Sequence, residues 1–291
     1  IVFRSYNQKR KANDIISKQK EIVEHKNKEI LDSINYAKYI QNALLPSEKV
    51  ISDLHVDCFI LFKPKDIVSG DFYWIHNNPS TKSTENEVYI AAVDCTGHGV
   101  PGALVSVVGN NGLNRCVKEF SIHDTGKILD KLSELVEETF EKSENELKDG
   151  MDISLLKIKS DTSASADNNL VHIQWSGANN PIWIIKKDSQ ILEEIKADKQ
   201  PVGKFEDKKD FKTHQLTLNK GDRLFLFTDG YADQFGGPKG KKFKYRQLEE
   251  LLLSTTRLTL NEQKQALEKA FDSWKANHEQ VDDVCIIGIS V

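Results

Sequence analysis

The sequence predicts an α+β fold that is preceded by one long helix. Residues 5–45 contain no proline or glycine, and their apolar residues recur at seven-residue spacing. From residue 56 onward, short runs of β-branched and aromatic residues are bounded by Gly, Pro, Asn or Asp. These strands mostly neighbour other strands, and the helical segments come in a few blocks. That order favours α+β layers over regular βαβ alternation.

The N-terminal helix carries a single apolar stripe. Its members are Ile16, Val23, Ile30, Ala37 and Leu44, widened by Ile15, Ile22, Ile34 and Ile40. The helix is expected to end at Leu45-Pro46, because proline disfavours helix in the residue before it. Such a stripe needs a partner, and a two-stranded coiled coil is the natural one, weakened by Gln19, Lys26 and Ser33 in the seam. The alternative is a helix packed on its own domain.

The start of the chain points to a longer protein. The first residue is Ile1, and the only methionine is Met151. Arg4, Lys9, Arg10 and Lys11 are accompanied by no acidic residue. This pattern fits the cytoplasmic edge of a preceding membrane segment, with an upstream sensor, and it fits a solvated basic helix start equally well. The fragment itself has no run of about 18 apolar residues, so nothing in it is expected to span a bilayer.

Charge and cysteine usage exclude some classes. The net charge is −4; residues 1–45 hold nine Lys/Arg and five Asp/Glu, a net of +4, which leaves −8 for residues 46–291. An acidic domain argues against nucleic acid as the main partner. Four cysteines without a CxxC pair suit a reducing, cytoplasmic compartment rather than a disulfide scaffold.

The remaining elements follow from apolar runs and turn residues. Strands are expected at 56–62, 71–75, 88–93, 153–158, 171–175, 182–185, 191–195, 223–227 and 284–291. Helices are expected at 101–119, 125–148, 245–254 and 261–277. Residues 77–87 and 160–169 are rich in Ser, Thr and Asn and are expected to be loops.

Aspartates at strand ends are the most informative feature. Asp71, Asp94 and Asp229 flank apolar runs, and Asp282 and Asp283 precede the last one. A carboxylate beside a buried strand is costly unless something compensates it. One such residue usually caps a turn or a helix, but several that converge need a cation, and oxygen ligands favour Mg²⁺ or Mn²⁺. Both readings stay open on the residues alone.

Other chemistries lack their motifs. The chain has no Walker-A pattern and no GxGxxG, so nucleotide use is unsupported. It has no nucleophile elbow that would indicate a serine hydrolase. Cys95 and His98 have no second Cys/His pair nearby, so a zinc site is not indicated.

From about Asp57 to the C-terminus, the chain resembles the SpoIIE-like branch of the metal-dependent (type 2C) serine/threonine protein phosphatases. The matching segments are 68–73 (VSGDFY), 94–99 (DCTGHG), 227–230 (FTDG) and 282–284 (DDV). The resemblance implies a four-layer α-β-β-α sandwich of two antiparallel sheets. It also implies two Mn²⁺ or Mg²⁺ ions per domain and hydrolysis of phosphoserine or phosphothreonine by a metal-activated water.

The resemblance also implies metal ligands. Asp94 would bridge the two ions, and the backbone carbonyl of Cys95 would bind the second ion. Asp229 and Asp282 would hold the first ion, with Asp283 as the alternative to Asp282.

Further residues are candidates for supporting roles. Asp71 would hydrogen-bond metal-bound waters, and Asp152 lies where a weaker metal contact could form. His98 could donate a proton to the leaving alkoxide; the alternative is a loop residue that hydrogen-bonds backbone. No arginine is placed to grip the phosphate, which leaves Lys63 and Lys65, or else a purely solvated role for both.

We therefore expect residues 1–45 to be a signalling and dimerisation helix and residues 46–291 to be a SpoIIE-like phosphatase domain. The expected function is a phosphoserine/phosphothreonine protein phosphatase, the output domain of a larger signalling protein. Its substrate would be a phosphoprotein, such as an anti-sigma-antagonist-like regulator. The alternative is a weak or inactive phosphatase fold that serves as a dimeric signalling scaffold. Residues 101–118 would move with the helix, or would be an ordinary core helix.

Overall fold

The computed structural model describes residues 2–54, 56–78, 85–141, 149–161 and 169–291. Its helices are α1 (Val2–Leu44), α2 (Glu48–Ser52), α3 (Gly99–Asn114), the π-helix η1 (Arg115–Glu119), α4 (Thr125–Phe140), α5 (Gly230–Asp233), α6 (Tyr245–Ser254) and α7 (Leu260–Lys275). Its strands are β1 (Asp57–Lys63), β2 (Phe72–Asn78), β3 (Glu85–Cys95), β4 (Gly150–Asp161), β5 (Leu170–Ala178), β6 (Ile182–Ile185), β7 (Leu192–Ile195), β8 (Val202–Gly203), β9 (His214–Asn219), β10 (Arg223–Phe227), β11 (Phe235–Gly236), β12 (Lys241–Lys242) and β13 (Val284–Ser290).

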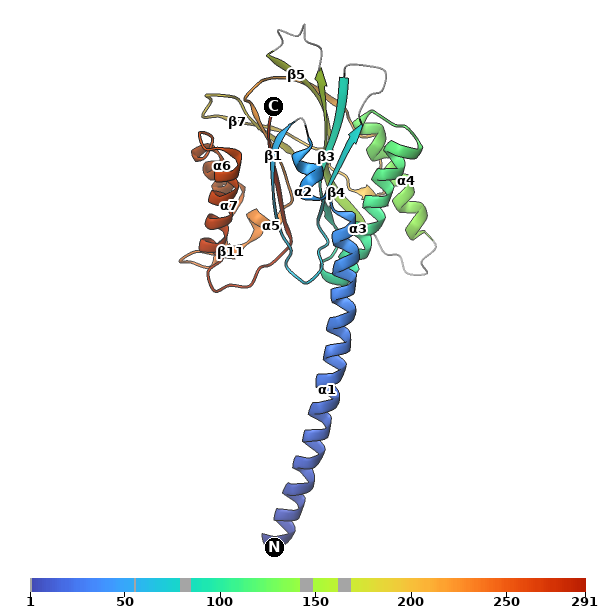
Figure 1. The fold of residues 1–291 in the computed structure, drawn as a ribbon, viewed down its shortest axis with the longest axis vertical. Coiled ribbons are helices and arrows are strands. Elements are labelled where there is room, and N and C mark those ends of the chain that lie inside the picture. Colours follow the sequence, from blue (N-terminus) through green and yellow to red (C-terminus); the bar gives the residue numbers. More distant parts are fainter. Residues whose placement is uncertain (1, 55, 79–84, 142–148, 162–168) are drawn as a thin grey trace.

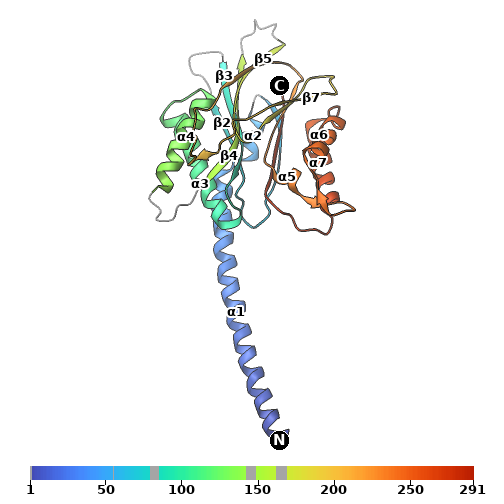
Figure 2. The same cartoon turned by 180° about the vertical axis from the view of Figure 1, so that it is seen from behind.

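Two antiparallel sheets form the centre of the molecule. One sheet has the strand order β1-β13-β10-β6-β7, and the other has the order β2-β3-β4-β5-β9, with β8 paired to β4. Helices α6 and α7 cover the outer face of the first sheet, and α3 and α4 cover the second (Figures 1 and 2). The expected four-layer α-β-β-α sandwich is confirmed.

Strands of the first sheet are apolar on both faces because both faces are buried. Along β10, Leu224 and Leu226 point into the core between the sheets. The alternate residues Phe225 and Phe227 point into a second core under α6 and α7. Alternation in a strand sends successive side chains to opposite faces, so a doubly covered strand reads as a continuous apolar run.

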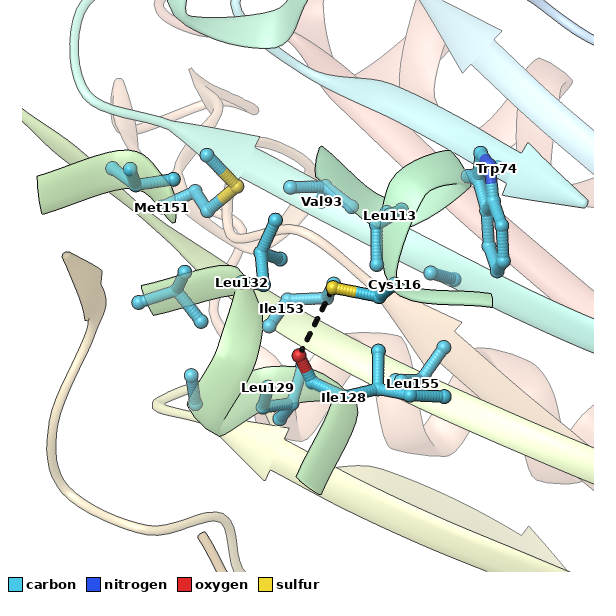
Figure 3. Packing of buried hydrophobic residues seen from close by; sticks show 14 of the residues in the cluster. Trp74, Val93, Leu113, Cys116, Ile128, Leu129, Leu132, Met151, Ile153 and Leu155 are labelled. Atoms are coloured by element: carbon cyan, nitrogen blue, oxygen red, sulfur yellow. Dashed lines mark hydrogen bonds between the residues drawn. The ribbon is translucent and has the colours of Figure 1, made fainter. Parts of the chain in front are cut away.

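A third core lies between the second sheet and helices α3 and α4. Figure 3 shows Val93 and Ile153 of the sheet packed against Leu113 and Leu132 of the helices. The Cys116 Sγ donates to the carbonyl of Ile128 over 3.7 Å, which ties η1 to α4. These contacts fix α3, whose N-terminus follows directly on residues 94–98.

Helix α1 projects away from the sandwich (Figure 1). Ile16, Val23 and Ile30 of the apolar stripe are all more than half exposed. Only the last turns touch the sandwich, where Gln41 is 7% exposed and packs beside α3. The stripe is therefore left uncovered by the chain's own domain over most of its length.

Several elements differ from the sequence expectation. Strand β9 (His214–Asn219) was not expected, because its sequence HQLTLN is half polar. The expected helix 101–119 is α3 continued by the π-helix η1. Parts of the expected loops 77–87 and 160–169, and residues 142–148 of the expected helix 125–148, lie outside the described residues. None of the described helices is long and apolar enough to cross a membrane.

Candidate active site

The topology brings the strand-end aspartates to one end of the sandwich. Antiparallel neighbours run in opposite directions, so the start of one strand lies beside the end of the next. Phe72 pairs with Val93, which sets Asp71 beside Asp94. Phe227 pairs with Ile286, which sets Asp229 near the Asp282–Asp283 pair. Helix α1 leaves the sandwich at this same end (Figure 1).

Asp152 joins the group from strand β4. It is the register partner of Asp94, so the two carboxylates sit on directly opposed positions of neighbouring strands. The Asn179 amide donates to the Asp152 Oδ1 over 2.8 Å. The loop after β5 therefore holds Asp152 in place at the edge of the cluster.

The carboxylates raise one another's pKa. Burial, followed by the charges of Asp229, Asp152 and Asp282, raises the pKa of Asp94 to about 8. Burial, followed by Asp282 and further acids, raises the pKa of Asp229 to about 6. Clustered anions without a counter-charge favour their protonated forms. The same arrangement would be stabilised by a bound cation.

Asp71 is the most buried member. It is 3% exposed, and its pKa is raised well above the usual range by burial and then by Asp94. A hydrogen bond with Thr228 lowers it in part. The other carboxylate oxygen, Oδ2, is buried and has no hydrogen-bond partner among the described residues. A buried orphan acceptor indicates a missing donor, such as an ordered water.

Asp282 and Asp283 play different parts although they are adjacent. Asp283 is 1% exposed, and its two oxygens accept from the backbone N–H groups of Lys65 and Gly70, both over 2.7 Å. Asp282 is half-buried, and among the described residues its Oδ1 accepts from the Asp283 N–H over 2.9 Å. Asp283 thus braces the loop between β1 and β2, whereas the Asp282 Oδ2 has no hydrogen bond within the described ranges.

Close backbone packing sets the position of the 94–99 loop. Gly97 has φ of 84°, a left-handed conformation that favours glycine. A Cβ at Gly70 or at Gly102 would overlap the Gly97 carbonyl. The loop is therefore wedged between the segment that carries Asp71 and the first turn of α3.

The charged candidates near the loop have specific partners. The His98 Nδ1 lies 2.9 Å from the Asp66 Oδ2, so the His98 ring contacts a carboxylate of the β1–β2 loop. The Nζ of Lys63 pairs with Asp272 and Glu268 of α7. The Lys65 side chain has no ion pair among the described residues, which leaves it available to an anion.

The Cys95 thiol is shielded. It is 4% exposed, and burial followed by the charge of Asp71 raises its pKa well above the usual range. A protonated, buried thiol is a poor nucleophile and a poor metal ligand. Any role of Cys95 at this site would fall to its backbone carbonyl, at the end of β3.

Sequence reasoning missed two residues at this end. Gln41 of α1 donates to the Ser69 carbonyl over 2.6 Å and accepts from the Ser69 N–H over 3.0 Å. The Tyr245 ring lies 6.0 Å from the Phe227 ring at an interplanar angle of 48°, and the Tyr245 pKa is raised by burial and then by Asp229 and other acids of the cluster. No motif marked either residue; a buried glutamine in a polar helix and an isolated tyrosine look ordinary in sequence.

The donor chemistry fits a hard divalent cation, although the described residues hold no ready-made cage. No three His, Cys, Asp or Glu side chains within the described ranges come close enough to form one. The surroundings nevertheless supply carboxylate oxygens with mutually raised pKa values and one orphan oxygen on Asp71. Oxygen donors of this kind suit Mg²⁺ or Mn²⁺, which keep several of their own waters.

The fold is that of a PP2C-type phosphatase domain. The model of the family "Stage II sporulation protein E (SpoIIE)" matches residues 84–291, more than half of the chain. The chain belongs to this family, the SpoIIE-like branch of the PP2C phosphatases. No curated protein matches the chain.

Solved structures share the fold. The SiaA-PP2C domain of Pseudomonas aeruginosa matches with a TM-score of 0.75 and 28% identity, over 91% of this chain and 98% of that one. The phosphatase domain and regulatory fragment of SpoIIE from Bacillus subtilis match with a TM-score of 0.60 and 16% identity, over 82% and 64%. RsbX in complex with magnesium matches with a TM-score of 0.52 and 15% identity, over 82% and 96%.

Proposed function

We propose that this protein is a metal-dependent phosphoserine/phosphothreonine protein phosphatase. The observation that carries the proposal is the placement of Asp71, Asp94, Asp229 and Asp282 at one end of the sandwich. Burial, followed by the charges of neighbouring acids, raises the pKa values of Asp71, Asp94 and Asp229. Membership of the SpoIIE family supports the general kind of reaction. RsbX, a protein of the same fold, is described in complex with magnesium.

Two Mn²⁺ or Mg²⁺ ions are the cofactors of this proposal. Asp94 would contact both ions, the Cys95 carbonyl would contact the second, and Asp229 and Asp282 would contact the first. Asp152 would add a weaker contact. When bound, the ions supply a water of lowered pKa and positive charge against the phosphoryl oxygens.

The chain's own residues orient the reactants. The orphan Oδ2 of Asp71 would accept a hydrogen bond from the attacking water and so fix its direction. His98, held by Asp66, would donate a proton to the leaving serine oxygen. Lys65 would contact the phosphate. Asp283 would act through backbone bracing, not as a metal ligand.

Residues 1–45 would couple this site to an upstream signal. We propose that the uncovered apolar stripe of α1 pairs with the same stripe of a second copy. Residues 46–291 would be the catalytic domain. The substrate would be a phosphoprotein regulator of the anti-sigma-antagonist type, and a sensor or membrane segment would precede α1 in the whole protein.

Hydrolysis of p-nitrophenyl phosphate and of a phosphoserine peptide tests the proposal. Wild type with Mn²⁺ should hydrolyse both, and EDTA should abolish the activity. Asp94→Asn should lose about 10³-fold in kcat or more, because it removes a group that acts directly on the reacting centre. Equal activity in both proteins would refute the proposal. A wild type that dimerises but hydrolyses neither substrate would favour the scaffold alternative.

A further inference from the structure

A basic hairpin borders the carboxylate cluster. Residues 235–248 contain four lysines and one arginine and no acidic residue, within a domain whose net charge is −8. Strands β11 and β12 form a hairpin over residues 235–242, and Gly237 and Gly240 in its turn have positive φ. We call residues 235–248, which add the first turn of α6, the basic hairpin. Lys239, Lys241 and Lys244 are exposed. Such a concentration of one charge sign creates a local field opposite to that of the rest of the domain.

Direct contacts connect the hairpin to the cluster. Asp229 begins helix α5, and the Asp233 N–H donates to the Asp229 carbonyl over 3.0 Å. The Asp233 carboxylate pairs with the Lys242 Nζ over 2.6 Å. Lys242 is also one of the charged groups that act electrostatically on Asp229. Figure 1 shows α5 and β11 toward the end of the sandwich from which α1 projects. The hairpin is thus a continuation of the candidate active site.

Most of the hairpin's cations are not used by the fold. Lys242 is paired with Asp233, and Arg246 is paired with Glu250. Lys239, Lys241 and Lys244 take part in no ion pair among the described residues. These three closely spaced cations are not explained by stability, because an exposed lysine without an ion pair contributes little to the free energy of folding. They remain available to an external anion.

A hollow lies among these lysines. It has a volume of about 330 Å³ and is lined by Gly236, Pro238, Lys239, Lys241, Lys242, Lys244, Gln247 and Trp274. The hairpin is rigidly backed there, because the Gly237 N–H donates to the Trp274 carbonyl over 2.8 Å and the Trp274 ring packs edge-on against Phe243. The Trp274 ring can pack against a side chain of a bound peptide segment, and the surrounding lysines can attract negative charges beside that side chain.

We propose that this hairpin is a docking surface for the acidic segment next to the phosphorylated residue of the protein substrate. The inference rests on the proposed phosphatase function and adds its substrate class. Acidic side chains a few residues from the phosphoserine would contact Lys239, Lys241 and Lys244, while a neighbouring side chain enters the hollow over Trp274. Charge complementarity argues for this occupant, because the carboxylates around it would otherwise repel an acidic substrate.

Matched peptides and matched variants test the proposal. Two phosphoserine peptides differ only in flanking Asp/Glu or Asn/Gln residues. The variant Lys239→Gln/Lys241→Gln/Lys244→Gln is compared with Lys127→Gln/Lys187→Gln/Lys220→Gln, which removes the same charge. The control lysines are exposed and lie on the first turn of α4, after β6 and in the β9–β10 turn, away from the cluster.

Wild type should prefer the acidic peptide in kcat/KM by about 10-fold, mainly through KM, as expected for three exposed charge contacts. The hairpin variant should lose this preference, and the control variant should keep it. Added salt should reduce the preference in wild type. Equal kcat/KM for the two peptides in wild type, or an unchanged preference in the hairpin variant, would overturn the proposal.

Failure of the phosphatase function would be seen separately. In that case wild type would hydrolyse neither p-nitrophenyl phosphate nor the peptides. Fluorescence anisotropy of the labelled acidic peptide then decides on docking alone. Salt-sensitive binding that is weakened only by the hairpin variant supports the surface, and absence of binding to wild type overturns it.

Discussion

Asp282 and Asp283 differ in the work that each carboxylate does. Both precede β13. Successive side chains of an extended chain point to opposite sides, so only one of the two can face the cluster, and the sequence does not show which one. Both carboxylate oxygens of Asp283 accept hydrogen bonds from backbone N–H groups of the β1–β2 loop, whereas Asp282 makes no such bond to that loop. This difference converts an ambiguous pair into one structural residue and one candidate ligand.

Substitutions at the pair should separate these roles. Asp283→Asn should lower the free energy of unfolding by about 2–4 kcal/mol, because a buried carboxylate that accepts two N–H groups is replaced by an amide with one acceptor. Asp282→Asn should change stability little and weaken Mn²⁺ binding. Urea unfolding and Mn²⁺ titration of both variants measure this. A destabilised Asp282→Asn with normal metal binding would reverse the assignment.

The raised pKa values make metal-free stability depend on pH. A carboxyl group whose folded-state pKa exceeds its unfolded value stabilises the fold below the unfolded pKa, and this stability is lost as pH rises through the folded pKa. For Asp94 that window runs from 3.8 to about 8, and for Asp229 it runs from 3.8 to about 6. In EDTA, wild type should therefore lose stability relative to Asp94→Asn as pH rises.

Thermal unfolding in EDTA checks this linkage. At pH 8.5 Asp94→Asn should melt about 3 °C or more above wild type, and the gap should shrink at pH 5.5. Mn²⁺ should remove the gap at pH 8.5 by neutralising the wild-type cluster. A gap that does not change with pH would contradict the mutual repulsion of the carboxylates.

At the scale of elements, the Gln41 side chain connects α1 to the segment that carries Asp71. Gln41 bonds both backbone groups of Ser69 and also the Ser106 hydroxyl of α3. Ser69 precedes Gly70 and Asp71, so the end of α1 contacts the segment that carries an active-site carboxylate. A displacement of α1 would reach Asp71 through these hydrogen bonds.

Gln41→Ala should therefore impair both stability and activity. It leaves the buried Ser69 N–H and carbonyl without partners, at a cost of about 1–3 kcal/mol. Phosphatase activity should fall about 10-fold at saturating Mn²⁺ if Asp71 loses its position. Asn35→Ala, at an exposed amide of the same helix outside the apolar stripe, is the control. Full activity in Gln41→Ala would show that α1 and Asp71 are not coupled.

The sequence predicted those elements whose burial produces a recognisable pattern of apolar residues. Strand β6 was predicted at 182–185 and strand β10 at 223–227, with the bounds that the structure has, because both faces of each strand are covered. Strand β9 was not predicted because its exposed face is polar. Helix α5 was not predicted because four residues are too few to show a helical period. Gln41 was missed because its partners, Ser69 and Ser106, lie far away in sequence.

At the scale of the whole molecule, α1 is the element whose apolar stripe stays exposed. Ile16, Val23 and Ile30 are all more than half exposed, so no described part of the chain covers them. The burial of several such side chains against a second copy would contribute about 1.5–3 kcal/mol each when complete. The fold therefore supports the expectation of pairing through α1, with the catalytic sandwiches carried at one end.

Sedimentation equilibrium tests the pairing. Deletion of residues 1–33 removes the uncovered stripe but keeps Gln41 on its partners, so the truncated chain should be a folded monomer and the full chain a dimer. Ile16→Asp should weaken the dimer, whereas Ser17→Asp, the same charge change on the next residue, should not. A monomeric full chain at high micromolar concentration would contradict pairing through α1.

The central claim is that the converging aspartates hold the ions of a phosphatase, and calorimetric titration with Mn²⁺ tests it most directly. Wild type should bind two equivalents of Mn²⁺, with affinity that rises from pH 6 to pH 8 as Asp94 loses its proton. Asp94→Asn should lose most of this binding while Lys220→Gln keeps it. Absence of Mn²⁺ binding to wild type at millimolar concentration, or equal binding to Asp94→Asn, would contradict the account.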